Sequence, residues 1–209
     1  MATSVRPFRN RSQTVSNLSR VVDYTLMHAA NDFAANHDGL EDPLKVYVQA
    51  SEILFVAGIA ALFLFFAPHL KRAAVAAGVS AGFALVVAHF LAAAVGRNRP
   101  FVDHPGVHMF MSHAPDPGFP SDHATGAFAI AFALLLRDRR VGIVALVLAF
   151  VLSVGRVTLG VHYPSDVFAG AILGLIAALI VWTPPVRRLV DRLTDELERR
   201  VLRRVPAAG

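Results

Sequence analysis

The chain has 209 residues, of which 55% are hydrophobic, and it carries a formal net charge of +5 and no cysteine. This length suits one domain or one helical membrane bundle, and the lack of cysteine excludes disulfides and thiolate metal sites. The mean hydropathy of +0.53 comes from long apolar blocks bordered by arginine, which favours membrane spans over nucleic-acid binding.

The N-terminal segment is expected to lie outside the bilayer core. Residues 1–13 are polar and basic, which predicts a flexible tail. Residues 15–36 place most apolar side chains on one helical face, with Arg20, Asp23 and Asn31 elsewhere. This pattern predicts an amphipathic helix at the membrane surface. The first 45 residues lack the apolar core of a cleavable signal peptide.

Five apolar blocks follow, each bordered by polar or basic residues. They predict membrane spans over residues 46–66, 73–95, 124–136, 141–154 and 167–182. The expected fold is an all-α integral membrane bundle over residues 46–182, followed by a charged cytoplasmic tail over 184–209. With the N-terminal helix, these segments predict a single membrane-embedded domain over residues 1–209.

Ionisable residues interrupt two of the blocks. Glu52 lies within the first, where a carboxylate is costly, so it is either functional or interfacial. His89 lies within the second and is expected to pack rather than to bind a ligand. The loop histidines His104, His108 and His113 are expected to form a polar loop or a substrate rim, because an irregular loop does not make them converge on a metal.

Three polar motifs lie at the ends of the blocks. They contain Arg97 and Arg99, then Ser121, Asp122 and His123, then Arg156, His162 and Asp166. Arginine can hold a phosphate through two donors, and histidine can attack or relay a proton. An aspartate four residues after a histidine can fix the tautomer of that ring. The third motif alone would also fit a polar turn, with Pro164 starting the next helix.

Alternation of the spans brings all three motifs to one side of the membrane. The loops that contain Lys71, Arg72 and residues 137–140 lie on the other side, together with the basic tail. By the positive-inside rule that side is cytoplasmic, so we expect the motifs on the extracytoplasmic side. The arginines of residues 1–13 argue mildly against an outer position for the tail.

The motif residues suit phosphoryl transfer without a metal or another cofactor. His162 is the expected nucleophile, which would form a phosphohistidine, and Asp166 would orient its ring. His123 would protonate the leaving oxygen and then activate water. The expected phosphate-binding residues are Arg97, Arg99, Ser121 and Arg156, and the role of Asp122 stays open.

The motifs resemble those of the type 2 phosphatidic acid phosphatase superfamily, whose pattern is Lys-x6-Arg-Pro, Pro-Ser-Gly-His and Ser-Arg-x5-His-x3-Asp. Arg99-Pro100, Pro120-Ser121-Asp122-His123 and Arg156…His162…Asp166 match it. Ala92 stands at the position of the first lysine, Asp122 at the glycine and Gly155 at the serine. The missing lysine removes one phosphate-binding cation, and Arg97 is a candidate to replace it. The matched region covers residues 70–180.

Within the superfamily, residues 119–125 and 160–167 are most similar to the bacitracin-resistance type of undecaprenyl-diphosphatase. The resemblance implies a multi-pass enzyme of the bacterial plasma membrane whose site faces outward. It would remove the terminal phosphate of undecaprenyl diphosphate, a polyprenyl lipid, and so recycle the carrier for peptidoglycan synthesis. The implied roles are nucleophile for His162, orienting carboxylate for Asp166, acid and base for His123, and phosphate binding for Arg99, Ser121 and Arg156.

Other functions fit the same residues. A phosphatase for phosphatidylglycerophosphate, phosphatidic acid or another phospholipid would use the same site. A vanadate haloperoxidase shares the residue pattern, but the short membrane-embedded chain argues against it. A transporter or scramblase would use Glu52, His89 and the arginines, although ionisable groups at one face fit a midplane transport path poorly.

Overall fold

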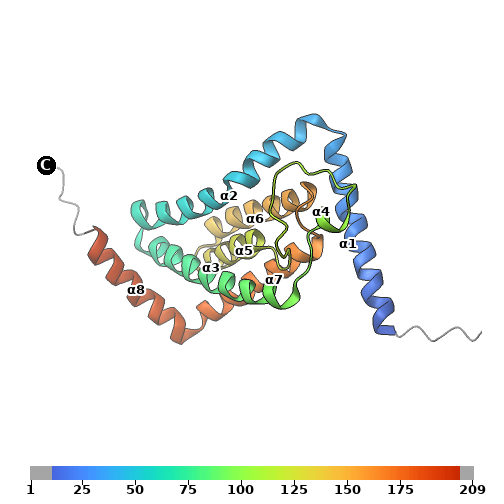
Figure 1. The fold of residues 1–209 in the computed structure, drawn as a ribbon. Coiled ribbons are helices and arrows are strands. Elements are labelled where there is room, and N and C mark those ends of the chain that lie inside the picture. Colours follow the sequence, from blue (N-terminus) through green and yellow to red (C-terminus); the bar gives the residue numbers. More distant parts are fainter. Residues whose placement is uncertain (1–10, 203–209) are drawn as a thin grey trace, which may run out of the picture.

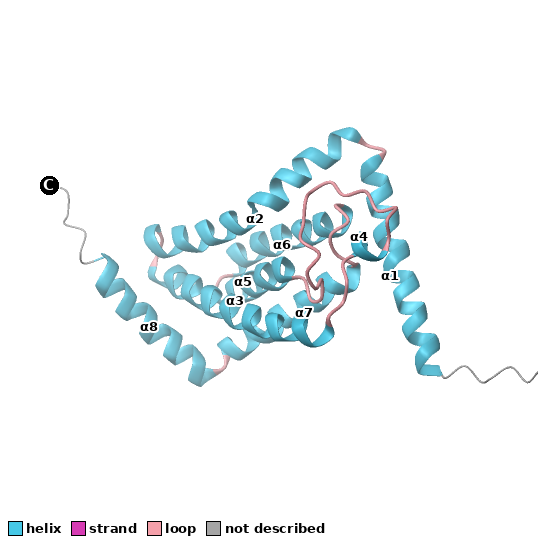
Figure 2. Ribbon diagram, in the orientation of Figure 1, coloured by secondary structure: helices cyan, strands magenta, loops and turns pink. Residues whose placement is uncertain are grey.

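The structure, a computed structural model, describes residues 11–202, and every regular element in that range is a helix (Figure 2). The helices are α1 (Arg11–Ala35), α2 (Asp38–Phe65), α3 (Pro68–Val95), α4 (Pro100–Asp103), α5 (Asp122–Arg137), α6 (Arg139–Thr158), α7 (Pro164–Trp182) and α8 (Pro184–Leu202). The expected all-α bundle is confirmed. Of the expected flexible tail, residues 1–10 lie outside the described residues and the last three belong to α1.

Four of the described helices are long and apolar enough to cross a membrane, namely α2, α3, α6 and α7, and the chain is a multi-pass membrane protein. The fifth expected span is α5, which has only 16 residues. At 1.5 Å per residue it is about 24 Å long, shorter than a hydrocarbon core of about 30 Å. It packs among α3, α6 and α7 in the middle of the bundle, where protein surrounds it (Figure 1).

Two glycines let α7 approach α5 closely. A Cβ atom at Gly170 would lie 2.9 Å from the carbonyl oxygen of Ser121, and one at Gly174 would lie 2.6 Å from the amide nitrogen of Ala129. Small residues allow such backbone contact between membrane helices. The N-termini of α5 and α7 therefore adjoin, and the Ser121 N–H donates to the carbonyl of Asp166 (3.1 Å).

Local signals end the helices at the same end of the bundle. Gly96 takes the left-handed conformation (φ 58°) that stops α3. Ser121 caps α5, where its Oγ accepts the Ala124 N–H at 3.4 Å. Pro164 opens α7 at the first helical position. As the alternation of spans predicted, the three motifs meet at this end.

Helix α1 lies across this end (Figure 1). Asp23 and Asn31 are buried, whereas Val21 and Leu26 are more than half exposed. The Asn31 Nδ2 donates to the carbonyls of His108 (3.0 Å) and Thr158 (2.9 Å). The helix is amphipathic as expected, but the face that packs on the bundle carries Asp23 and Asn31 together with Met27 and Ala34, and the apolar face with Val21 and Leu26 is free to contact lipid.

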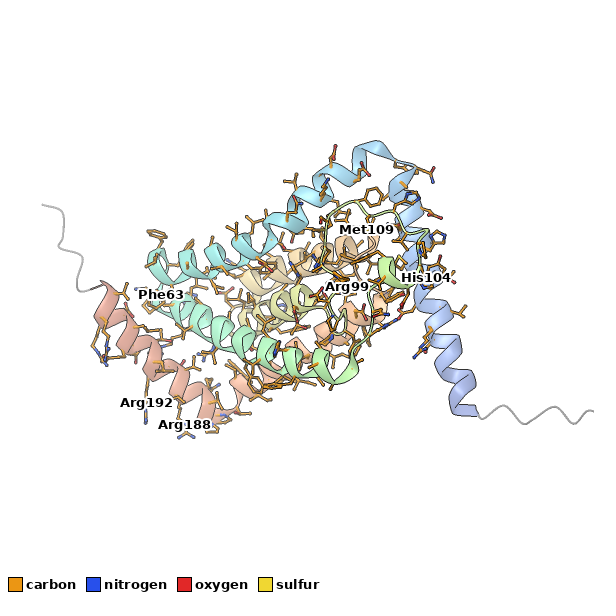
Figure 3. All side chains as sticks on the ribbon, viewed as in Figure 1. Phe63, Arg99, His104, Met109, Arg188 and Arg192 are labelled. Carbon is orange, nitrogen blue, oxygen red and sulfur yellow. The ribbon has the colours of Figure 1, made fainter. Side chains whose placement is uncertain are left out.

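Helix α8 lies at the opposite end, where ion pairs hold it. These pairs are Lys71–Glu198 (2.7 Å), Arg72–Asp195 (3.2 Å) and Arg137–Asp191 (2.8 Å). Val190 is buried in a small cluster with Ala76 and Val181. Arg188 and Arg192 point away from the bundle (Figure 3).

Candidate active site

His162 lies in the short connection between α6 and α7 and is 1% exposed. Its Nδ1 lies 2.9 Å from the carbonyl oxygen of Gly118. Its Nε2 lies 2.9 Å from Nη1 of Arg99 and 3.2 Å from Nη2 of Arg156. A carbonyl only accepts and a guanidinium only donates, so Nδ1 carries the hydrogen and Nε2 keeps a free electron pair. This tautomer makes Nε2 the nucleophilic nitrogen.

Arg99, labelled in Figure 3, is the residue directly before α4, and its guanidinium contacts His162. Its Nε donates to Oδ1 of Asp116 (2.9 Å), and its Nη1 also donates to the carbonyl of Val161 (3.1 Å). The side chain is 5% exposed. A Cβ atom at Gly118 would lie 3.0 Å from the Arg99 Cγ. Because glycine has no Cβ, the loop can pass close to the arginine at this position.

Arg156 comes from the last turn of α6 and is 1% exposed. Its Nη2 lies 3.2 Å from both His162 Nε2 and His113 Nε2. Its Nε is buried without a hydrogen-bond partner, and no carboxylate of the described residues lies within ion-pair distance. A buried guanidinium with histidines as its only side-chain partners is prepared for an anionic ligand.

Burial and nearby positive charge keep the imidazole rings of His162 and His113 neutral. Burial lowers the pKa of His162 well below its usual range, and the charges of Arg156 and Arg99 lower it further. The pKa of His113 is lowered by burial and by the same two arginines. Burial acts to raise the pKa of Asp116, but its hydrogen bond and charge pairing with Arg99 lower it overall. The site at neutral pH thus combines neutral imidazoles with arginine cations.

Asp166, the expected orienting residue, lies farther from the histidine than a hydrogen bond allows. Its Oδ2 is 3.6 Å from Nδ1 of His162 and accepts the Tyr163 N–H at 2.8 Å. Its Oδ1 accepts from Arg97 at 3.0 Å. The carbonyl of Gly118 therefore occupies the hydrogen-bonding position that the sequence assigned to this carboxylate.

Arg97 binds protein groups in this structure. Its Nη2 donates to Oδ2 of Asp23 (2.6 Å), and its Nη1 donates to Ser165 Oγ (2.6 Å) and Asp166 Oδ1 (3.0 Å). The guanidinium also lies 4.2 Å from the centre of the Tyr163 ring. These contacts favour a positioning role for Arg97 over the phosphate contact expected from the sequence.

His123 lies in the first turn of α5, and its Nε2 is 3.1 Å from Oε1 of Glu52. Ser121 is fully buried at the N-cap, where its Oγ accepts a backbone N–H and its hydroxyl hydrogen stays available. Asp122 is exposed in the same turn. The second motif thus contributes an N-terminal helix turn, a hydroxyl and a histidine, and a helix N-terminus favours bound phosphate.

Two loop residues complete the site: Asp116 was missed by sequence reasoning, and His113 was expected only as part of a polar loop or a substrate rim. His113 contacts Arg156, and Asp116 pairs with Arg99. Both lie in the polar stretch between the first two motifs, which was the available signal. The neighbouring histidines diverge from them: His104 lies against the Tyr24 ring (3.9 Å between centroids) and His108 bonds α1 through its backbone.

The sequence matches the family model described as PAP2 superfamily over residues 73–188. It is 30% identical over 160 residues to "Undecaprenyl-diphosphatase BcrC" of Bacillus subtilis (strain 168), a match that covers 76% of this chain and 82% of that protein. It is 38% identical over 134 residues to "Bacitracin transport permease protein BcrC" of Bacillus licheniformis, which covers 62% of this chain and 66% of that protein.

The fold resembles a solved membrane phosphatase. The crystal structure of the first transmembrane PAP2-type phosphatidylglycerolphosphate phosphatase, from Bacillus subtilis, superposes with a TM-score of 0.62 at 22% sequence identity. The superposition covers 88% of this chain and 89% of that one. At this identity the likeness concerns the fold alone.

Proposed function

The chain belongs to the PAP2 superfamily, and from this premise we propose that it hydrolyses undecaprenyl diphosphate to undecaprenyl phosphate and inorganic phosphate. The observation that carries the proposal is the unprotonated Nε2 of buried His162, which accepts hydrogen bonds from the guanidiniums of Arg99 and Arg156. A nucleophile with two cations at the attacking atom fits a phosphoryl group better than any neutral substrate.

In the first step, Nε2 of His162 attacks the terminal phosphorus. A nitrogen–phosphorus bond forms as the bond from phosphorus to the bridging oxygen breaks, and the lipid phosphate leaves. Arg99, Arg156 and the hydroxyl of Ser121 stabilise the charge on the phosphoryl oxygens. His123 gives its proton to the leaving oxygen and becomes neutral.

In the second step, water attacks the phosphohistidine. His123, now neutral, takes one proton from the water as the oxygen–phosphorus bond forms and the nitrogen–phosphorus bond breaks. Inorganic phosphate leaves and His162 is restored. Arg97 and Asp166 hold the connection that carries His162, and the arginines supply the positive charge that this chemistry requires.

The substrate assignment rests on the named relative from Bacillus subtilis, which matches over most of both chains. We place the protein in the bacterial plasma membrane, with helices α2 to α7 as the catalytic bundle and polyprenyl diphosphate as its lipid partner. The end that carries α8 has Lys71, Arg72 and the exposed arginines, which favours the cytoplasm for that end. The active site then opens on the extracytoplasmic side.

Phosphate release by the detergent-purified protein tests this function. Undecaprenyl diphosphate, phosphatidic acid and phosphatidylglycerophosphate would be compared in the presence of EDTA, each with His162→Ala as the control. We expect a strong preference for the polyprenyl diphosphate that vanishes in the variant. Equal or better use of a glycerophospholipid would keep the mechanism and replace the substrate.

The same purified protein can test the alternative function, a transporter or scramblase. Proteoliposomes with the His162→Ala protein should show no substrate-dependent lipid flux above empty vesicles. Continued flux, together with no phosphate release by the unaltered protein, would favour a transporter over a phosphatase. Loss of activity in EDTA that a divalent ion restores would contradict the metal-free scheme.

A further inference from the structure

A second carboxylate reaches the site from α2. Glu52 lies midway along the apolar segment Glu41–Phe65, and its Oε1 is 3.1 Å from Nε2 of His123. Its side chain is 72% exposed, whereas that of His123 is 21% exposed. A carboxylate is costly in an apolar membrane helix and commonly marks a functional position. Here its contact with a histidine of the site points to what that function is.

The other elements packed around His123 bring mainly positive charge. Arg156 comes from α6, Arg99 from the segment before α4, and His113 from the loop before α5. Asp122 precedes His123 in its own helix. Burial and these neighbouring positive charges lower the pKa of His123, and an adjoining carboxylate acts against that shift. Among the described residues, the carboxylate within ion-pair distance of the His123 ring is that of Glu52.

We propose that Glu52 is a positioning residue that stabilises the protonated form of His123 in both steps of the reaction. This inference rests on the phosphatase function proposed above and extends it to a residue outside the three motifs. In the first step His123 passes its proton to the leaving oxygen while Glu52 stays ionised. In the second step the imidazole takes a proton from water, and the carboxylate again faces the resulting cation.

The contribution of Glu52 depends on the leaving group. A lipid phosphate that leaves from a diphosphate carries its negative charge in water at neutral pH. A lipid alkoxide that leaves from a phosphate monoester is far more basic and needs the proton of His123. Loss of the carboxylate charge should therefore slow hydrolysis of a lipid monophosphate more than that of a lipid diphosphate.

The test compares Glu52→Gln, Glu52→Asp and Gln49→Ala, the last being an exposed position one turn earlier on the same helix. Each variant is assayed for kcat/KM against pH on undecaprenyl diphosphate and on a lipid phosphate monoester. Thermal unfolding in detergent establishes that the variants stay folded. Glu52→Asp keeps the charge and should recover most of the activity, and Gln49→Ala should match the unaltered protein.

For Glu52→Gln we expect kcat/KM on the monoester to fall about tenfold further than on the diphosphate. The alkaline limb of the profile should also move about one pH unit lower, because His123 then loses its proton more readily. If the protein hydrolyses only the diphosphate, the pH position of the alkaline limb is by itself the test of the role of Glu52.

Two results would overturn the proposal. An equal loss on both substrates with an unmoved alkaline limb would leave Glu52 a purely structural role, and a profile identical to that of the unaltered protein would leave it none. Failure of the proposed function looks different, because the unaltered protein would then release no phosphate from any of the lipids, and the inference about Glu52 would fall with it.

Discussion

The two ends of the bundle both gather charged side chains, but they balance them differently. At the α8 end, Lys71, Arg72 and Arg137 each have a carboxylate partner, at 2.7 to 3.2 Å. At the α1 end, Arg156 is 1% exposed, and within residues 11–202 its side-chain hydrogen-bond partners are the rings of His113 and His162, while Arg99 divides its donors between Asp116 and the site. The α1 end thus holds a buried cation, Arg156, that has no carboxylate within ion-pair distance among the described residues, whereas these three cations of the α8 end are paired.

The charged residues at the α8 end attach a helix to the bundle, whereas those at the α1 end serve catalysis. The pairs at the α8 end join Lys71, Arg72 and Arg137 to carboxylates that stay about one-quarter to one-half exposed, and they mainly fix where α8 lies. A buried cation without a carboxylate is costly in the empty site, and a phosphoryl group removes that cost when it binds. Substitutions at the two ends should therefore have effects of different size and kind.

The largest effect should come from His162→Ala. We expect turnover to fall by about 10⁴-fold or more, because the variant lacks the atom that bonds phosphorus. Phosphate release measures the loss, and a trapped ³²P-labelled phosphohistidine in the unaltered protein should be absent from the variant. Substantial remaining turnover would show that another residue is the nucleophile.

Arg156→Ala should come next. Removing one donor to the developing charge typically costs about 10²- to 10³-fold in rate, and this cation has no carboxylate to compensate for its loss. Arg156→Lys should restore little, since an ammonium lacks the planar fork of donors that a guanidinium offers to two phosphoryl oxygens. A rate within threefold of the unaltered protein would contradict a role for the unpaired Arg156 cation in catalysis.

A smaller loss should follow from breaking a matched pair at the α1 end. Asp23→Asn removes the charge that holds Arg97 and Ser165 to α1. We expect a decrease of about 10- to 100-fold in kcat/KM from misplacement of the loop that carries His162. Val22→Ala, an exposed change on the same helix, is the control. Equal activity of both variants would mean that α1 does not order the site.

Mild acid should have a smaller effect, which acts on the stability of the protein through His162. Since the folded-state pKa of His162 is lowered, the unfolded chain binds the extra proton first, and the free energy of unfolding should decrease as pH falls below about 6.5. Above that pH the contribution is constant. ¹⁵N NMR of the His162 ring should show the neutral tautomer at pH 6, with the hydrogen on Nδ1. An imidazolium signal at that pH would contradict the assignment.

The smallest effect should come from the α8 end. Lys71→Ala removes the partner of Glu198 and should lower stability by about 1 kcal/mol or less, since Glu198 is itself about one-third exposed. The kcat/KM should stay within twofold of the unaltered protein. Both quantities, kcat/KM and thermal unfolding in detergent, can be measured on one preparation. A tenfold loss of kcat/KM would show that the α8 end affects catalysis at the α1 end.

Sequence alone gave an incomplete account of the N-terminal helix. The periodicity of residues 15–36 correctly predicted an amphipathic helix, because apolar spacing is a local property. It could not say which face packs on the protein. Asp23 and Asn31 are buried because their partners, Arg97, Ser165 and the carbonyls of His108 and Thr158, lie far away in the chain.

By itself the sequence determined the helical class, the apolar helices and the convergence of the three motifs at one end. Each of these follows from hydropathy, helix length and the alternation of direction. Only the tertiary structure decided which groups touch. Gly118 rather than Asp166 bonds Nδ1 of His162, and Arg97 binds carboxylates. Such pairings depend on the path of an irregular loop and on the docking of α1, which no local pattern encodes.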